Sequence, residues 1–349
     1  MEIIVRIINF IYHFGFIRLF LIFFIWINLF AFTLYGVDKY RAIHKKLRMS
    51  ERTLIFFTLV CGGIGATLGA FIFKHKKNKT NFKVALILGM VIAVIPFIHV
   101  VHSLTLDTRI RYVEIDFYSA NWPASLDGYR IGFMTDMHTI TDEEMANVVA
   151  RLNQKNLDLL LLGGDFSVIN YRYQGTLREI SHTITTDGIF GVEGNHDHYQ
   201  QLFTAMRHLG MTPLDNSGVR IREGFYLAGV QDLWIRNPNI AQAIAGAYPE
   251  DFILLLTHNP DVSMEQPTSD VDLILAGHTH HGQITIFGYP IYLHRGSITS
   301  YGTRFAHGFA ASADGVPVFT SSGIGVYYFW PRIFARPEVV IFTMYHQSY

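Results

Sequence analysis

Residues 129–138 have the sequence YRIGFMTDMH, and this stretch decides the fold of most of the chain. The largely apolar run at 130–134 predicts a buried strand. Asp136 and His138 follow directly, at the point where the predicted strand ends. In α/β folds, ligand sites form just beyond the carboxyl ends of the strands. The stretch therefore predicts an α/β domain with a polar site at the end of its first strand.

Four more apolar runs are each followed by Asp, Asn or His where the predicted strand ends. They are residues 157–162 before Gly163-Gly164-Asp165, residues 188–192 before Gly194-Asn195-His196-Asp197, residues 252–256 before Thr257-His258, and residues 271–276 before Gly277-His278-Thr279-His280. Helices are predicted between the runs at 142–156, 200–209 and 239–247, the first capped by Thr141 or Asp142. We therefore expect all five strand ends to converge on one place.

The residue types at these strand ends are those of a transition-metal site. Residues at i and i+2 leaving a strand point the same way, so Asp136 and His138 can reach one metal ion together, as can His278 and His280. A mixed set of His, Asp and Asn suits Mn, Fe or Zn rather than Mg or Ca. Two divalent ions would outweigh the charges of Asp136 and Asp165, which leaves the site electropositive towards phosphate.

The ordered series DxH, GGD, GNHD, TH and GHTH resembles the calcineurin-like metallophosphoesterase superfamily, over about residues 128–345. The resemblance implies an α/β/β/α sandwich and hydrolysis of a phosphodiester or pyrophosphate bond with two divalent metal ions. It also implies a role for each metal ligand: Asp136, His138 and His280 bind the first ion, Asp165 bridges both, and Asn195, His258 and His278 complete the second site. A hydroxide shared by the two ions would attack phosphorus. His196 would be catalytic, by stabilising the phosphoryl charge or protonating the leaving group.

The C-terminal tail resembles a membrane-associated branch of that superfamily, in Gly282-Gln283-Ile284, residues 322–325, Arg332 and Pro337-Glu338. Some members of the branch cleave the pyrophosphate of a lipid-sugar nucleotide, so we expect a lipid-linked or nucleotide-lipid substrate. A soluble phosphodiester such as a nucleotide, or a non-catalytic membrane sensor, stays as an alternative. His281 departs from the branch, which usually has glycine there, and either touches substrate or faces solvent.

Charge divides the chain into two unlike parts. Residues 1–101 carry 13 Lys and Arg against 3 Asp and Glu, whereas residues 102–349 carry 15 against 25. The second part holds 13 of the 17 histidines and a single lysine, Lys155. Because binding to phosphate backbones relies on Lys and Arg, this balance disfavours nucleic acid as a partner. The one cysteine, Cys61, excludes an intramolecular disulfide and leaves the redox compartment open.

Three apolar segments, at about 16–35, 54–73 and 84–101, are each close to the roughly 20 residues that cross a bilayer as a helix. We therefore expect an all-α transmembrane region at 1–101, a linker at 102–127 and the catalytic domain at 128–349. Membrane lipids are expected partners, and the oligomeric state stays open. Residues 25–100 also resemble a small family of multi-pass membrane proteins of unassigned function, through Asp38-Lys39, Glu51-Arg52, Gly62-Gly63, Gly65-Ala66 and His75-Lys76.

Two basic loops, at 38–52 and 74–83, flank the second apolar segment. If that segment crossed the membrane fully, the loops would lie on opposite faces, against the positive-inside rule. The conflict disappears if the segment is re-entrant and turns back at residues 62–65, which are rich in glycine. We therefore expect both loops in the cytoplasm and the catalytic domain on the outer face. A cytoplasmic catalytic domain is the alternative.

Overall fold

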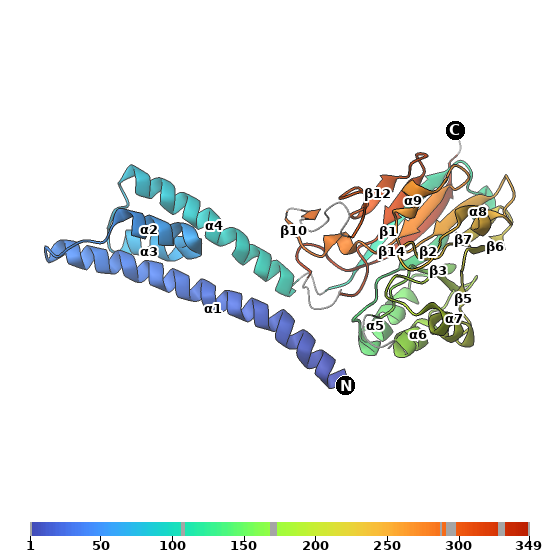
Figure 1. Ribbon diagram of the computed structural model, residues 1–349, viewed down its shortest axis with the longest axis horizontal. Helices are drawn as coiled ribbons and strands as arrows, with labels where there is room; N and C mark the ends of the chain where they lie inside the picture. The colour runs from blue at the N-terminus through green and yellow to red at the C-terminus, as the bar shows by residue number, and fades with distance from the viewer. Residues whose placement is uncertain are drawn as a thin grey trace. The chain divides into compact units, whose positions relative to one another are not determined.

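The computed structural model describes residues 2–105, 109–167, 173–286, 288–290, 298–326 and 332–347. The chain divides into two compact units, residues 1–105 and 106–349, and each is described by itself (Figure 1).

The first unit is helical. Its elements are α1 (Glu2–Ile43), α2 (Glu51–Phe57), the π-helical turn η1 (Thr58–Gly62), α3 (Gly63–Ile72) and α4 (Thr80–Thr105). Three stretches are long and apolar enough to cross a membrane: residues 20–43, 51–72 and 80–98. Large apolar side chains such as Ile22, Leu29 and Ile87 are more than half exposed, as expected for surfaces that face lipid.

The second apolar segment folds back on itself. As one straight helix, Glu51 and Ile72 would lie about 32 Å apart. Instead the Glu51 carboxylate lies 3.0 Å from the Lys76 ammonium and 2.6 Å from that of Lys79, just beyond the end of α3. Figure 1 shows α2 and α3 as two short stacked helices between α1 and α4. The two basic loops therefore meet at one end of the unit.

The chain reverses at Val60 and Cys61, whose backbones are non-helical, rather than at residues 62–65. Asn28 of α1 donates to the Cys61 carbonyl (2.9 Å) and accepts from the Gly65 amide (2.9 Å), which satisfies backbone groups freed by the break. The glycines allow close packing against α1 and are not themselves the turn, since a Cβ on Gly65 would lie 1.8 Å from the Asn28 carbonyl oxygen. Asn28 precedes Asp38 by ten residues, so the turn lies about 15 Å along α1 from the end of the unit where the basic loops meet.

The second unit contains two six-stranded sheets. The first has the order β1-β14-β2-β3-β4-β5, and the second has the order β12-β13-β9-β8-β7-β6. The strands of the first are β1 (Arg111–Ser119), β2 (Tyr129–Met134), β3 (Leu159–Leu162), β4 (Ile189–Gly191), β5 (Thr212–Pro213) and β14 (Glu338–His346). The strands of the second are β6 (Ser217–Arg222), β7 (Phe225–Gly229), β8 (Phe252–Leu256), β9 (Leu273–Ala276), β12 (Gly308–Ala311) and β13 (Pro317–Thr320). A separate hairpin pairs β10 (Thr285–Ile286) with β11 (Tyr289–Pro290).

Helices cover the outer faces of both sheets, so the predicted α/β/β/α sandwich is confirmed. Helices α5 (Asp142–Leu152), α6 (Tyr173–Ile180) and α7 (Tyr199–His208) share an apolar core with the outer face of the first sheet, and lie side by side in Figure 1. Helices α8 (Ile240–Ile244) and α9 (Val262–Glu265) share another core with the second sheet. A third core lies between the sheets. In β3, Leu159 and Leu161 face that inner core while Leu160 and Leu162 face the helices, as the two-residue period of a strand requires.

The expected linker at 102–127 is partly wrong, because residues 111–119 form β1. This strand pairs in parallel with β14 along nine residues, from Arg111 opposite Glu338 to Ser119 opposite His346. Its burial alternates between half-buried and exposed, as at the edge of a sheet, so its apolar signal in the sequence is weak. Short 3-10 helices at Ala124–Leu126 (η2) and His280–Gly282 (η3) complete the described elements.

Candidate metal centre

The five predicted strand ends meet in one place, but they come from both sheets. Strands β2, β3 and β4 of the first sheet run in parallel, as do β8 and β9 of the second. The residues that follow these strands supply all seven predicted ligands: Asp136, His138, Asp165, Asn195, His258, His278 and His280. The site therefore lies at the shared edge of the two sheets, where their parallel strands end.

Four of these side chains form a first group, with ligand atoms all within 4.8 Å of one another: Asp136, His138, Asp165 and His280. The Nε2 atoms of His138 and His280 lie 2.9 Å apart, and His280 Nε2 lies 3.2 Å from Asp136 Oδ1. His138 Nε2 lies 3.5 Å from Asp165 Oδ2. All four residues are buried, so little water competes for the lone pairs of their nitrogen and carboxylate oxygen atoms.

Asp165 joins a second group on its other side. His258 Nε2 lies 3.2 Å from Asp165 Oδ2 and 3.2 Å from Asn195 Oδ1. His278 Nδ1 lies 3.3 Å from His258 Nε2. The structure thus brings all seven residues into two sets of ligand atoms that share one carboxylate, which is the arrangement that a pair of cations needs.

The backbone of the site is strained at the ligands. Five of the seven have positive φ, in the region that favours glycine: Asp136 (53°), His138 (40°), Asp165 (56°), His278 (71°) and His280 (51°). Such conformations cost about 1–3 kcal/mol each and cluster at active sites and ligand clamps. Backbone strain at five convergent ligand residues is more typical of a binding site than of residues that only pack in a core.

Backbone carbonyls fix which imidazole nitrogen faces the site. His258 Nδ1 donates to the Gly163 carbonyl oxygen at 2.7 Å, which leaves the Nε2 lone pair for a ligand. His278 Nε2 donates to the Ile298 carbonyl oxygen at 2.9 Å, which leaves Nδ1. Metal-binding histidines almost always have such a partner on the other nitrogen, because it sets the tautomer and the ring orientation.

Burial controls the protonation of the site. It lowers the pKa of His138 and of His278 to about 3, so both rings are neutral near pH 7 and have a lone pair to give. Burial also opposes charge on His258 and Asp165, but their mutual attraction prevails, raising the pKa of His258 and lowering that of Asp165 well away from their usual values. A cation that binds between them must displace the His258 proton.

Two family models match the chain. Residues 129–282 match the model described as calcineurin-like phosphoesterase. The chain contains a calcineurin-like metallophosphoesterase domain. Residues 28–82 match a model described as a protein of unknown function, DUF1294. The resemblances of the catalytic domain to the calcineurin-like superfamily and of the N-terminal region to a family of unassigned function are thereby confirmed.

Relatives of the phosphoesterase domain also occur in proteins with membrane segments. An uncharacterized metallophosphoesterase of Helicobacter pylori is 29% identical over 226 residues, which are 61% of this chain and 58% of the relative. The metallophosphoesterase YkuE of Bacillus subtilis is 28% identical over 254 residues, 67% of this chain and 85% of the relative. A transmembrane protein with metallophosphoesterase domain from Danio rerio is 25% identical over 252 residues, 66% of this chain and 56% of the relative.

Asp197 organises the two loops that carry Asp165 and Asn195. Its buried carboxylate accepts hydrogen bonds from the backbone amides of Asp165 (2.7 Å), Phe166 (2.9 Å) and Gly194 (2.9 Å). Burial, with the charge of Asp165 adding to it, raises the pKa of Asp197, and the hydrogen bonds from the Gly194 and Phe166 amides oppose that rise. Asp197 thus fixes the backbone beside Asp165 and Asn195.

A loop distant in the sequence supports Asp136 of the phosphoesterase domain. The Gly325 amide donates to the Asp136 carbonyl oxygen at 2.7 Å, and the Ile324 amide donates to that of Thr135. Arg332, only 1% exposed, donates to the Gly325 carbonyl oxygen and so holds this loop. Sequence reasoning did not assign this loop a role, because nothing local connects it to Asp136.

His196 and Trp234 lie where the site is more open. His196 is half-buried, its ring centroid is 5.6 Å from that of His138, and its amide donates to Asp165 Oδ1 at 2.9 Å. Trp234 is 50% exposed and meets the His278 ring edge-on at 4.4 Å. Tyr173 is buried in the core at the start of α6 and does not face the site. Tyr171 and the aromatic run at 327–330 lie outside the described residues.

His281 lies outside the group of seven proposed ligands, and its half-buried side chain does not point freely into solvent. Its ring stacks on that of His307, with centroids 4.6 Å apart and planes 20° apart. His307 Nε2 in turn lies 2.8 Å from the buried Glu338 carboxylate. Burial lowers the pKa of His281 to about 4, so the ring is neutral near pH 7.

Proposed function

We propose that this chain hydrolyses a phosphodiester or pyrophosphate bond with the help of two divalent metal ions, on a substrate that is lipid-linked or a nucleotide-lipid. The observation that carries the proposal is the pair of ligand groups that share Asp165 in a calcineurin-like domain. A site built only for one ion would need neither the second group nor the shared carboxylate.

We assign the residues as follows: Asp136, His138 and His280 hold one ion, Asp165 holds both, and Asn195, His258 and His278 hold the other. Mn, Fe or Zn fits this mixture of imidazole, amide and carboxylate better than Mg or Ca. When bound, such ions supply Lewis acidity and a water that ionises near neutral pH. The buried, neutral histidines and the fixed tautomers of His258 and His278 prepare the donors for that task.

His196 is the residue that acts on the substrate. Its half-buried ring lies at the edge of the first group, and its amide is fixed on Asp165, so the ring is held beside the bond to be cleaved. From there it donates a hydrogen bond to a phosphoryl oxygen or a proton to the leaving oxygen, which is worth roughly 10²–10⁴-fold in rate.

The membrane unit supports a lipid substrate. The apolar helices α1 and α4 hold the chain at a bilayer, where a lipid substrate is concentrated and a soluble one is not. The half-exposed Trp234 beside His278 offers an apolar surface next to the site. Soluble phosphodiesters are the rival substrates within the same chemistry.

The folded-back segment favours a catalytic domain outside the cytoplasm. The ion pairs of Glu51 with Lys76 and Lys79 put both basic loops at one end of the helical unit. By the positive-inside rule that end is cytoplasmic. Helix α4 starts there and is long enough to cross the bilayer, so the chain that follows it emerges on the opposite side.

Purified full-length protein tests the chemistry. We expect about two Mn, Fe or Zn ions per chain and turnover that a chelator abolishes and added Mn restores. H196Q should keep its metal and lose about 10²-fold or more in turnover, whereas H208Q, a change at an exposed histidine of α7, should change neither. Active protein without transition metal would overturn the proposal.

Substrate and sidedness have separate tests. Turnover of a lipid-linked pyrophosphate should exceed that of a soluble chromogenic diester, and equal rates would remove the lipid part alone. Protease added to intact cells should cut exposed loops of residues 109–349, while cysteines placed in the basic loops stay protected from an impermeant reagent. The reverse pattern would place the catalytic domain in the cytoplasm.

A further inference from the structure

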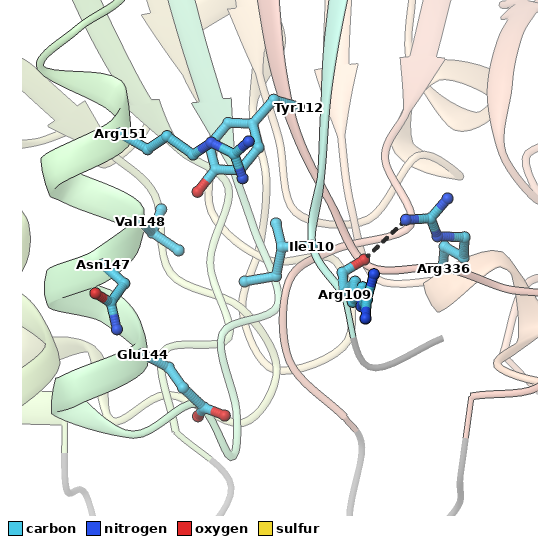
Figure 2. Close-up of a pocket in the computed structure, with 8 residues that line it drawn as sticks. All are labelled: Arg109, Ile110, Tyr112, Glu144, Asn147, Val148, Arg151 and Arg336. Atoms are coloured by element: carbon cyan, nitrogen blue, oxygen red, sulfur yellow. Dashed lines mark hydrogen bonds between the residues drawn. The ribbon is translucent and has the colours of Figure 1, made fainter. Parts of the chain in front are cut away.

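A basic groove of about 700 Å³ lies between the start of β1 and helix α5, apart from the proposed ligands. Figure 2 shows Arg109, Ile110 and Tyr112 on one side of it, facing the Val148 and Arg151 side chains of α5. Its volume is within the range of sites that bind small molecules, which is roughly 300–1,000 Å³.

Positive charge gathers in the groove. Within the described part of the chain, no carboxylate lies within 4.0 Å of the guanidinium of Arg109 or Arg151. Arg336 lies next to Arg109 and donates to its backbone carbonyl (Figure 2). The one acid in the lining, Glu144, is engaged at Thr141 in the capping box of α5. The groove therefore presents the guanidinium groups of Arg109 and Arg151 to a ligand, and such groups suit phosphate.

The same groove has an apolar wall. Ile110 and Tyr112 pack against the core under α5, and Val148 belongs to that core. Arg151 lies over the Tyr112 ring at 4.5 Å, which holds its guanidinium in place. A ligand that fits both features carries a phosphate and an apolar part, as a phospholipid does.

The groove also begins where the chain leaves its last apolar helix. Only residues 106–108 separate Thr105, at the end of α4, from Arg109. Four steps of extended chain reach at most about 14 Å. Arg109, so close in sequence to a membrane-spanning helix, is within reach of lipid headgroups, and a basic residue near the surface strengthens binding to an anionic bilayer about fivefold.

We propose that this groove binds the phosphate of an anionic phospholipid, and so docks the catalytic unit on the bilayer surface. Arg109 and Arg151 contact the phosphate, while the half-buried Ile110 meets the glycerol and first methylenes. The proposal does not depend on the reaction at the metal centre.

The test uses the full-length chain in lipid nanodiscs. A fluorophore is placed at N147C, an exposed position in the groove, with Cys61, the one native cysteine, changed to serine. The discs contain a lipid with a spin label on its headgroup as a quencher. We expect strong quenching in discs that contain phosphatidylglycerol and weak quenching in discs of phosphatidylcholine alone. A fluorophore at Q201C on α7, away from the groove, should show no such difference.

Variants assign the effect to the arginines. R109Q/R151Q should remove most of the quenching that depends on phosphatidylglycerol, by about fivefold per arginine. R178Q/R207Q, which removes the same charge from exposed positions on α6 and α7, should leave it unchanged. Similar unfolding temperatures for both pairs would show that the fold is intact.

Three results would overturn the proposal. One is equal quenching in the two kinds of disc. Another is full quenching in R109Q/R151Q. The third is release of the quenching by inorganic phosphate, but not by chloride at the same ionic strength, because the groove would then prefer a soluble phosphate to a lipid.

Discussion

The Nε2 atoms of His138 and His280 lie 2.9 Å apart, although 142 positions separate the two residues. One follows a strand of the first sheet and the other a strand of the second, so their contact depends on how the two sheets are packed. The site therefore exists only while the two sheets are packed in this way. Changes that separate the sheets should disrupt metal binding before they abolish the fold.

Metal-free protein should lose stability as pH rises, because of His258. Burial opposes its charge, but Asp165 raises its pKa well above the usual value. A histidine with a raised pKa stabilises the folded chain fully at pH values below its pKa in the unfolded chain, about 6.5. That stabilisation is lost as pH rises through its pKa in the folded chain. We expect the unfolding temperature in chelator to fall above about pH 6.5. The lowered pKa of Asp165 changes stability only below about pH 4, where aspartate titrates in the unfolded chain. It therefore does not affect stability above pH 6.5.

H258Q is the control for that prediction, because it removes the titrating group. Its unfolding temperature in chelator should depend less on pH over the same range, and the dependence that remains comes from buried acids with raised pKa values, such as Asp197. Metal affinity of the native chain should rise with pH in that window, since binding needs a neutral imidazole. An unfolding temperature that rises with pH in the native metal-free chain would contradict the assignment.

D197N should weaken metal binding although Asp197 is not a ligand. Its carboxylate accepts three backbone N–H groups from the Asp165 and Asn195 loops, and an amide cannot accept all three. We expect affinity to fall about 10–100-fold, as for other residues that orient ligands. Isothermal titration with Mn measures it. D270N, at an exposed loop position, should bind like the native chain.

G323A should displace Asp136. Gly323 has a φ of 72°, and a Cβ there would lie 2.6 Å from the Asp136 Cβ. Gly302 has a φ of 63° but open space around a Cβ, so G302A isolates the cost of the backbone conformation, about 1–2 kcal/mol. Both variants should lose stability, and G323A alone should lose metal content by elemental analysis. Equal metal content in the two would show that the loop yields without moving Asp136.

N28L should loosen the tip of the folded-back segment. It removes the hydrogen bonds to Cys61 and Gly65 that satisfy broken backbone inside the helical unit. Buried polar contacts of this kind in membranes are worth about 0.6–1.7 kcal/mol. Unfolding in a graded detergent mixture should show that loss. T33V, which removes an exposed hydroxyl bonded only within α1, should be neutral.

H281G should distinguish a substrate contact from simple packing. His281 has a φ of 54°, so glycine relieves backbone strain while the stack on His307 is lost. We expect the two effects to offset each other to within about 1 kcal/mol, with metal content unchanged. A rise in KM at constant kcat would then identify His281 as a residue that contacts the substrate. Unchanged kinetics would restrict it to packing on His307.

Several features of this protein follow from the sequence alone. The strand-like runs that precede Asp136, Asp165, Asn195 and His258 are local patterns, and the residues after them match a known ordered series. The helix cap, expected at Thr141 or Asp142, is local as well, and the structure places it at Thr141. Apolar length alone likewise indicates the membrane segments. Each of these signals lies within about twenty consecutive residues, which is why a linear reading finds them.

Other features were decided only by the tertiary structure. Sequence reasoning missed that β14 inserts between β1 and β2, and it took β1 for linker, because pairing between residues such as Arg111 and Glu338 leaves no mark in either stretch. It also placed the membrane turn at the glycines rather than at Val60 and Cys61, where Asn28 supplies the hydrogen bonds. Local periodicity encodes elements and their faces, whereas sheet order, helix reversal and tautomer choice depend on partners that the folded chain brings from far away.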